Sequence, residues 1–304
     1  MQRSAFAFRE EKLDWIGLAK LLSWANNQMG NLELIFSTLL VKGSVKLMTY
    51  SKYKLAVCIT TGLLLMADAA TVAISQTNID GTLTTPEIFK QSQDAYASLS
   101  SYSDDGKTIS SFGTSEIAPC TFTVKLARPN LYRIEWKQQE NSSFMNKGVV
   151  WSAGESDFMV MGDGAPIREG SREFALGGAT GISGGAAATI PGTFFNMGWG
   201  NQLGPGSSNS KRQADDKVGD VDCYVFASEL KGRTRTLWIG KKDFLIHQVR
   251  TVTSPEALTK LLAEAAKRNP GLPASLQSSG SAISTETHMN IVVNKQILPA
   301  EFAQ

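Results

Sequence analysis

The chain has 304 residues, 42% of them apolar and 19% charged, so it can bury a substantial core. Its formal net charge is +2. Residues 1–70 hold 8 of the 30 basic and 5 of the 28 acidic side chains, so the rest is near neutral, which excludes a basic nucleic-acid-binding surface. With three Cys, two His and no C-x-x-C pair, the sequence indicates no metal site and no cofactor.

An export signal is the sharpest local feature. A short basic stretch at 48–54 precedes an apolar run of 13 residues, Leu55–Ala67, and small residues follow. Asp68 ends the run well short of the ~20 residues needed to span a bilayer. This is the order of a secretory signal, which we expect over 48–75, with export to the periplasm.

The signal stands behind 47 other residues, where it cannot act normally. We therefore interpret Met48 as the true start and residues 1–47 as an upstream extension that arises from a misread start site. The alternative is a genuine amphipathic extension, because several apolar residues between Ile16 and Ala25 recur at helical spacing.

The remaining residues, 80–304, are predicted to form a single domain that begins with a helix over 85–99, with a Thr cap and Pro86 at the first helical position. From Ser100 onward, apolar and polar residues alternate with a period of two, which is typical of β-strands. Strands are predicted at 120–126, 132–136, 148–153, 158–161, 222–229, 233–239, 244–252 and 283–293. Because turns this short cannot return a parallel strand, we expect a mainly β (α+β) fold with a curved antiparallel sheet.

Two segments interrupt the strands. Residues 177–206 contain ten glycines, and a second helix is predicted over 255–268 with Ser254 as its cap.

One motif within the glycine-rich segment could carry catalysis. Gly181-Ile-Ser183-Gly-Gly185 fits G-x-S-x-G, and His247 or His288 follows in the order a serine hydrolase needs. No strand precedes Ser183, however, and the mechanism requires a strand-to-helix turn. We therefore expect no catalytic residues and interpret each His as a hydrogen-bonded sheet or surface residue.

Cys120 and Cys223 remain once the signal is removed, and in an oxidising compartment they can form a disulfide. Buried free thiols are the alternative, and strand phase does not decide between the two.

The strongest resemblance to a known family lies in Leu126–Trp136, which carries an Arg-Pro-Asn-Leu-aromatic turn, and in the hairpin that begins at Gly148. These segments resemble the periplasmic outer-membrane lipoprotein carriers, the LolA-like proteins. The resemblance implies an unclosed β-barrel covered by helices around an apolar cavity. It also implies that Arg128 helps to hold a lid closed. The glycine-rich segment departs from the family pattern, and Trp136 lies further along its strand than the family's aromatic residue.

Alternation alone predicts a buried apolar face on the sheet, which helices must cover. With Arg128, the ligand-binding candidates are Phe122, Val124, Tyr132, Ile134, Trp136, Phe158 and Val160. The lid candidates are Phe194, Phe195 and Trp199.

We expect a monomeric, non-enzymatic periplasmic carrier that binds lipid or lipoprotein acyl chains non-covalently. An envelope sensor or scaffold that binds a membrane protein through the same fold is the alternative, and a hydrolase acting through Ser183 ranks third.

Overall fold

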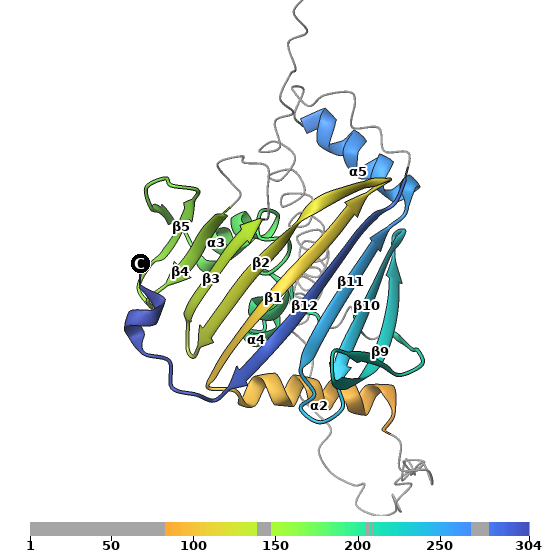
Figure 1. Cartoon of the computed structure of the whole chain (residues 1–304), viewed down its shortest axis with the longest axis horizontal. Coiled ribbons are helices and arrows are strands. Elements are labelled where there is room, and N and C mark those ends of the chain that lie inside the picture. Colours follow the sequence, from red (N-terminus) through yellow and green to blue (C-terminus); the bar gives the residue numbers. More distant parts are fainter. Residues whose placement is uncertain (1–82, 139–146, 205–206, 208, 269–279, 304) are drawn as a thin grey trace, which may run out of the picture.

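The computed structural model describes residues 83–138, 147–204, 207, 209–268 and 280–303 (Figure 1). The expected extension at 1–47 and signal at 48–75 lie outside the described residues. Within the described ranges, every helix falls short of the length and apolar character that crossing a membrane requires.

Twelve strands form one sheet in which every neighbouring pair is antiparallel. The strands are β1 (Ser101–Phe112), β2 (Ser115–Ala127), β3 (Leu131–Gln138), β4 (Lys147–Ser152), β5 (Asp157–Met161), β6 (Ile167–Glu169), β7 (Lys211–Arg212), β8 (Asp216–Val218), β9 (Val221–Leu230), β10 (Arg233–Gly240), β11 (Ile246–Thr253) and β12 (Ala282–Val293). Their order is β6-β5-β4-β3-β2-β1-β12-β11-β10-β9-β7, with β8 paired to β9 off this path. Because β6 and β7 do not pair with each other, the sheet is unclosed, which confirms the predicted fold class.

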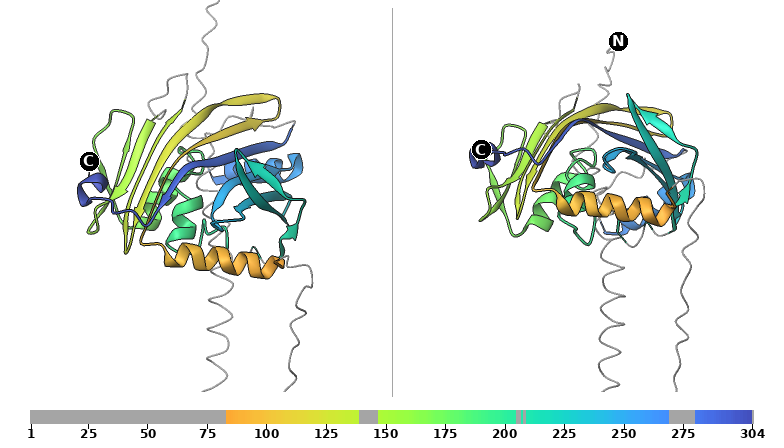
Figure 2. Two further views of the ribbon diagram at one scale, coloured as in Figure 1. Left: turned by 60° about the horizontal axis from the view of Figure 1, so that its bottom comes forward. Right: turned by 90° about the horizontal axis from the view of Figure 1, so that it is seen from below.

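The described residues form four α-helices, three of which lie on the concave side of the sheet. They are α2 (Thr85–Ser98), α3 (Arg172–Thr180), α4 (Thr189–Phe194) and α5 (Pro255–Arg268), with a 3-10 turn η3 (Pro299–Phe302) near the C-terminus. Figure 2 shows the sheet arching over α2, α3 and α4, while α5 lies beyond the ends of the strands in Figure 1. Both longer helices match their predicted ranges closely, although Thr84 rather than Thr85 is the cap of α2.

α2 runs along the concave side and is fastened to the half of the sheet that contains β9, β10 and β11. The Phe89 ring packs 4.8 Å from that of Phe226 in β9. Further along the helix, the Tyr96 hydroxyl accepts a hydrogen bond from the Ile246 N–H (3.1 Å). Figure 2 shows α2 crossing below the arch, and these contacts hold it to one end of the sheet.

Strand register decides which side chains meet α2, α3 and α4. Phe122 lies opposite Trp136, and Val124 lies opposite Ile134. All four are buried in the main core cluster, together with Tyr132 and Leu126. These residues form the concave apolar face that the alternation predicts.

The strand β5 was predicted, but the prediction that Phe158 and Val160 lie on its concave face was wrong. Phe158 pairs with Trp151 and Val160 pairs with Val149, whereas Met159 pairs with the core residue Val150. Phe158 and Val160 therefore lie on the convex face, and the Phe158 ring stacks on Trp151 with centroids 5.4 Å apart. Since both faces of β5 are apolar, alternation could not tell them apart.

The C-terminal residues cover part of this convex face. Phe302 of η3 is fully buried. Arg133 in β3 donates to the Ala303 carbonyl (2.7 Å), and Lys125 in β2 pairs with Glu301 (2.8 Å).

Two glycines make room for the largest rings of the concave face. Gly106 in β1 pairs with Phe122, and Gly148 in β4 pairs with Trp136. A side chain at either glycine would overlap the ring of its partner. Each aromatic ring thus lies across the neighbouring strand, a cross-strand arrangement that stabilises curved sheets.

We predict that Gly106→Ala lowers the free energy of unfolding by about 1–3 kcal/mol, the usual cost of overpacking a core. The new Cβ would lie 2.7 Å from the Thr287 carbonyl as well as overlapping Phe122. Urea unfolding measures the change. Gly170→Ala is the matched control, because nothing lies within 4 Å of a Cβ at Gly170. Equal stability of the two variants would contradict this account of the packing.

Candidate functional site

The concave apolar face is covered by residues 172–204, which we call the cover segment. It contains α3, α4 and most of the glycine-rich stretch, and it is rich in small residues. Its buried core members are Ala175, Leu176, Ala179, Ile182, Ala186, Ala187, Ile190, Phe194, Met197 and Leu203. The cover segment therefore completes the core across the opening of the arch.

Arg128, in the turn between β2 and β3, ties the cover segment to α2. Its Nη2 donates to the carbonyls of Phe194 (2.8 Å) and Tyr96 (3.2 Å), and its Nε donates to the carbonyl of Leu99 (3.0 Å). The guanidinium also lies over the Phe194 ring, 4.6 Å from its centroid. These carbonyls stand at the C-terminal ends of α2 and α4, where helix carbonyls lack intrahelical partners. One exposed side chain thus joins two helix ends.

The other lid candidates also lie at this end of the cover segment. The Phe195 ring is 6.4 Å from that of Tyr132, and Arg172 stacks over it at 4.7 Å. Trp199 is partly buried against the core. The structure therefore brings Phe194 and Phe195 together beside Arg128, whereas Trp199 is placed only against the core.

Two further contacts fasten the middle of the cover segment to the sheet. Thr108 in β1 donates to the Gly184 carbonyl (3.1 Å), and Thr189 at the start of α4 donates to Glu286 Oε2 (2.7 Å). Gly184 and Gly185 have φ angles of 67° and 109°. A Cβ at Gly185 would lie 2.7 Å from Glu286 Oε2. The two glycines thus allow a tight turn to approach the sheet closely.

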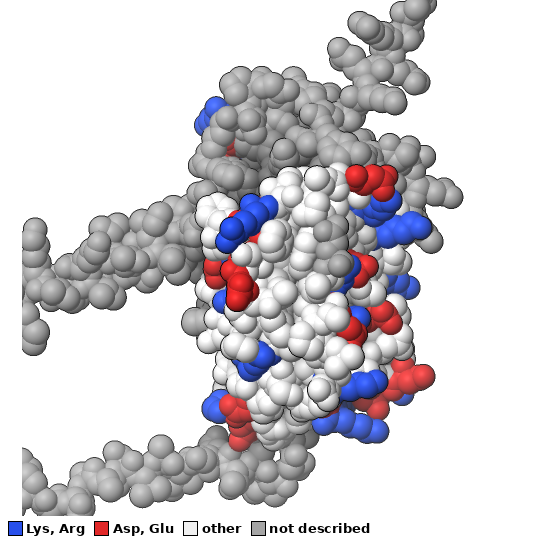
Figure 3. Space-filling model, turned by 90° about the vertical axis from the view of Figure 1, so that its left-hand side faces the viewer, with Lys and Arg blue, Asp and Glu red and all other residues white. Residues whose placement is uncertain are grey.

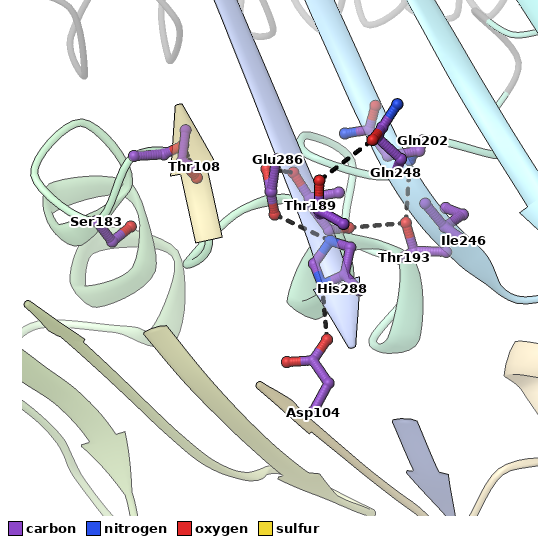
Figure 4. Close-up of polar contacts among 12 residues, drawn as sticks. Asp104, Thr108, Ser183, Thr189, Thr193, Gln202, Ile246, Gln248, Glu286 and His288 are labelled. Carbon is purple, nitrogen blue, oxygen red and sulfur yellow. Dashed lines mark hydrogen bonds and ion pairs between the residues drawn. The ribbon is translucent and has the colours of Figure 1, made fainter. Parts of the chain in front are cut away.

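A buried charged cluster lies under this turn (Figure 4). His288 in β12 lies between two carboxylates, with Nδ1 2.6 Å from Asp104 Oδ2 and Nε2 3.2 Å from Glu286 Oε1. The Tyr102 hydroxyl donates to the same Asp104 oxygen (2.7 Å). Burial alone would lower the pKa of His288, but the charge and hydrogen bond of Asp104, with those of Glu286, raise it to about 10. His288 is therefore an imidazolium at neutral pH.

We predict that His288 stays protonated through neutral pH. Since its folded pKa lies above the unfolded value of ~6.5, its contribution to stability is complete below pH ~6.5 and is lost as the pH rises towards 10. NMR of the imidazole protons measures this directly, because the chain has only two His. His247→Gln assigns the signals, and a His288 signal that titrates near pH 6.5 would contradict the prediction.

The hydrolase arrangement is not formed. The Ser183 hydroxyl donates to the Thr180 carbonyl (3.3 Å) and accepts from the Ala187 N–H (3.1 Å), both within its own segment. Figure 4 shows Ser183 in the cover segment beyond Thr108, apart from His288, whose two nitrogens face carboxylates. His247 pairs with Asp243 (2.9 Å). The G-x-S-x-G pattern here is a turn of the cover segment.

The disulfide considered from the sequence is absent between the described cysteines. Cys120 and Cys223 are both free and buried. Cys120 belongs to the main core cluster on the concave face, whereas Cys223 packs with Val225 and Trp238 in a separate cluster. β2 and β9 are separated by four strands in the sheet.

We predict that both thiols react with an alkylating reagent only after denaturation, without any reductant. Burial raises the pKa of each thiol to about 12, so the folded protein presents little reactive thiolate. Mass spectrometry of the alkylated peptides measures the reaction, with Cys120→Ser as control. A peptide that links Cys120 to Cys223 under non-reducing conditions would contradict it.

The structure thus gathers most of the predicted site and adds residues that sequence reasoning missed. Phe122, Val124, Tyr132, Ile134 and Trp136 lie on the concave face. The missed residues are Tyr102, Asp104, Thr189 and Glu286, and His288 was not expected to pair with two carboxylates. The only sequence signal for this cluster was the triplet Glu286-Thr-His288, whose two outer residues share one face of a strand.

No protein-family model and no curated protein matches the chain. Solved structures with a similar fold include a DUF1329 family protein from Desulfovibrio piger, 12% identical, covering 73% of this chain and 98% of that one (TM-score 0.33). A LolA superfamily protein from Nitrosomonas europaea is 11% identical and covers 73% and 99% of the two chains (TM-score 0.30). LprF from Mycobacterium bovis is 10% identical, with 69% and 93% covered (TM-score 0.40). The structural neighbours therefore include LolA superfamily proteins, the class that the sequence resembles, and the likeness is one of fold alone.

Proposed function

We propose that the chain is a periplasmic carrier that holds the acyl chain of a lipid or lipoprotein between the concave face and the cover segment. The observation that supports this most is the way the apolar face is covered. A segment of small residues, joined to α2 by the exposed guanidinium of Arg128, takes the place of a closing strand. The periplasmic location rests on the signal expected at 48–75.

Exchange between the cover segment and a ligand depends on the apolar surface that each buries. Each acyl methylene that leaves water gains about 0.8 kcal/mol. The core members of the cover segment are four alanines and six larger apolar side chains, so the acyl chain must be long enough to replace their buried surface. Arg128 bonds main-chain carbonyls, which water can satisfy after the cover moves. The cover can therefore leave without stranding a buried charge at this point.

The concave side chains supply the proposed contact surface. Phe122, Val124, Tyr132, Ile134 and Trp136 would line the acyl chain, and Phe194, Phe195 and Trp199 would move with the cover segment. Phe158 and Val160 are removed from this set because they lie on the convex face.

We predict that Arg128→Leu speeds the uptake of an acyl probe by about tenfold. The variant loses three hydrogen bonds, each worth about 0.5–1.5 kcal/mol, and 1.4 kcal/mol corresponds to a factor of ten. Stopped-flow fluorescence with cis-parinaric acid, whose polyene emits on leaving water, measures the rate.

Arg133→Gln is the matched control for this experiment. Arg133 lies on the neighbouring strand but bonds Glu135 and the C-terminal segment, so its loss should leave uptake unchanged. A full-length chain that binds no acyl probe would overturn the carrier function. Binding with equal rates in all three proteins would overturn the role of Arg128 alone.

A second candidate is an envelope sensor or scaffold that binds a membrane protein. On α3, Phe174 exposes 70% of its surface, and Ile167 of the edge strand β6 exposes 51%. Figure 3 shows the side of the molecule on which β5 lies, where charged side chains leave an uncharged strip between them. If the chain acts as a sensor or scaffold, it should take up no acyl probe, so the stopped-flow measurement separates the two candidate functions.

A further inference from the structure

Two arginines continue the concave face of β10 beyond its apolar half. In this strand Arg233 and Arg235 alternate with Thr234 and Thr236 and share a face with Leu237, which belongs to the core cluster. Residues two apart on a strand lie about 6–7 Å from each other. Both arginines are half-buried. The strand therefore holds two neighbouring guanidiniums on the inner side of the arch.

Within the described residues, no hydrogen bond or ion pair reaches the guanidinium of Arg233 or of Arg235, and their cross-strand neighbours are uncharged. Arg235 lies between Ser228 and Thr251, and Arg233 lies between Leu230 and Thr253. Arg133 and Arg212, by contrast, pair with Glu135 and Asp215.

This arrangement carries an electrostatic cost. Desolvation lowers the pKa of both side chains, and the charge of Arg233 adds to the effect at Arg235, whose pKa falls to about 10. Both remain charged at neutral pH, so the pair repels itself without a nearby anion. A half-buried pair of like charges on an inner face is compensated when an anion binds between them.

The inner side of this half of the sheet is thus divided into two regions. Phe226, Leu237 and Val249 form an apolar region in register on β9, β10 and β11. One step further along the same strands, Ser228, Arg235 and Thr251 form a polar, cationic row. Such a surface matches a molecule with an apolar chain and an anionic end.

We propose that Arg233 and Arg235 bind the anionic headgroup of an amphiphile, through its carboxylate or phosphate oxygens, while its acyl chain lies against the apolar region. Guanidinium groups suit this chemistry because their planar N–H donors match both anions in a bidentate manner. The inference rests on the proposed carrier function and specifies the class of ligand.

The test compares cis-parinaric acid with its methyl ester on the full chain at neutral pH. The two probes share a polyene chain and differ only in the charge of the head. We expect the wild type to bind the acid about tenfold more tightly than the ester. Arg235→Gln and Arg233→Gln should each remove most of this difference by weakening the acid alone.

Arg250→Gln is the matched control. Arg250 is exposed on β11 opposite Thr236, on the convex face, so its loss should affect neither probe. Arg235→Lys retains the charge and should keep part of the preference for the acid. Urea unfolding verifies that each variant is folded.

The outcomes separate the two hypotheses. If neither probe binds, the carrier function fails. If both bind equally and the Arg→Gln changes have no effect, the headgroup site is overturned and the carrier function stands. Inorganic phosphate, titrated alone by calorimetry, forms the third arm and should bind only weakly. Tight phosphate binding that Arg235→Gln abolishes would identify a free-anion site and overturn the amphiphile proposal.

Discussion

An antiparallel sheet that curves without closing must bury its concave apolar face against something other than itself. That constraint organises the rest of the structure. The rings of Phe122 and Trp136 lie across glycines of the neighbouring strands, so the concave face is continuous over β1 to β4. α2 crosses the arch, and the cover segment fills the remaining opening. Neither α2 nor the cover segment belongs to the hydrogen-bond ladder of the sheet, so side chains hold both of them in place. The strength of each attachment therefore depends on the side chains that make it.

The contacts that hold the cover segment differ in the free energy that breaking them costs. Arg128 is exposed and bonds carbonyls that water can satisfy. Thr189, by contrast, bonds a buried carboxylate of the Glu286–His288–Asp104 cluster. Moving Thr189 away would leave Glu286 with one partner fewer in a water-poor site, which is costly. The attachment of α4 near Phe194 is therefore weaker than its attachment near Thr189.

The sequence predicted strands in which apolar and charged residues alternate, and it missed β1, whose buried face is partly polar, and the short helices α3 and α4 of the glycine-rich stretch. β3 was predicted because Tyr132, Ile134 and Trp136 alternate with charged residues. β1 was missed because its inward residues include Asp104 and Gly106, which pattern reasoning assigns to a surface or a turn. The burial of Asp104 depends on His288, 184 residues away, and no local pattern records such a pairing.

The residues of the candidate site also divide into those that a local sequence pattern locates and those that only the fold locates. The family-like turn located Arg128, and alternation located the apolar face in β2 and β3, because both are local properties. The face of Phe158 could not be deduced, since β5 is apolar on both sides and only its register with β4 decides. Arg233 and Arg235 were assigned to a strand, but whether a strand's charges point outward or inward depends on its neighbours. Leu237, packed against the core, fixes that direction.

The proposed carrier function requires a ligand to displace part of a filled core. The cover segment contributes four alanines and six larger apolar side chains to that core, and its displacement would leave the large rings of β2 and β3 in place. The proposal therefore requires a balance between a closed state stabilised by the protein's own cover and an open state stabilised by a ligand. The unpaired charges of β10 would bias that balance towards ligands with an anionic end, since only those relieve the repulsion between Arg233 and Arg235.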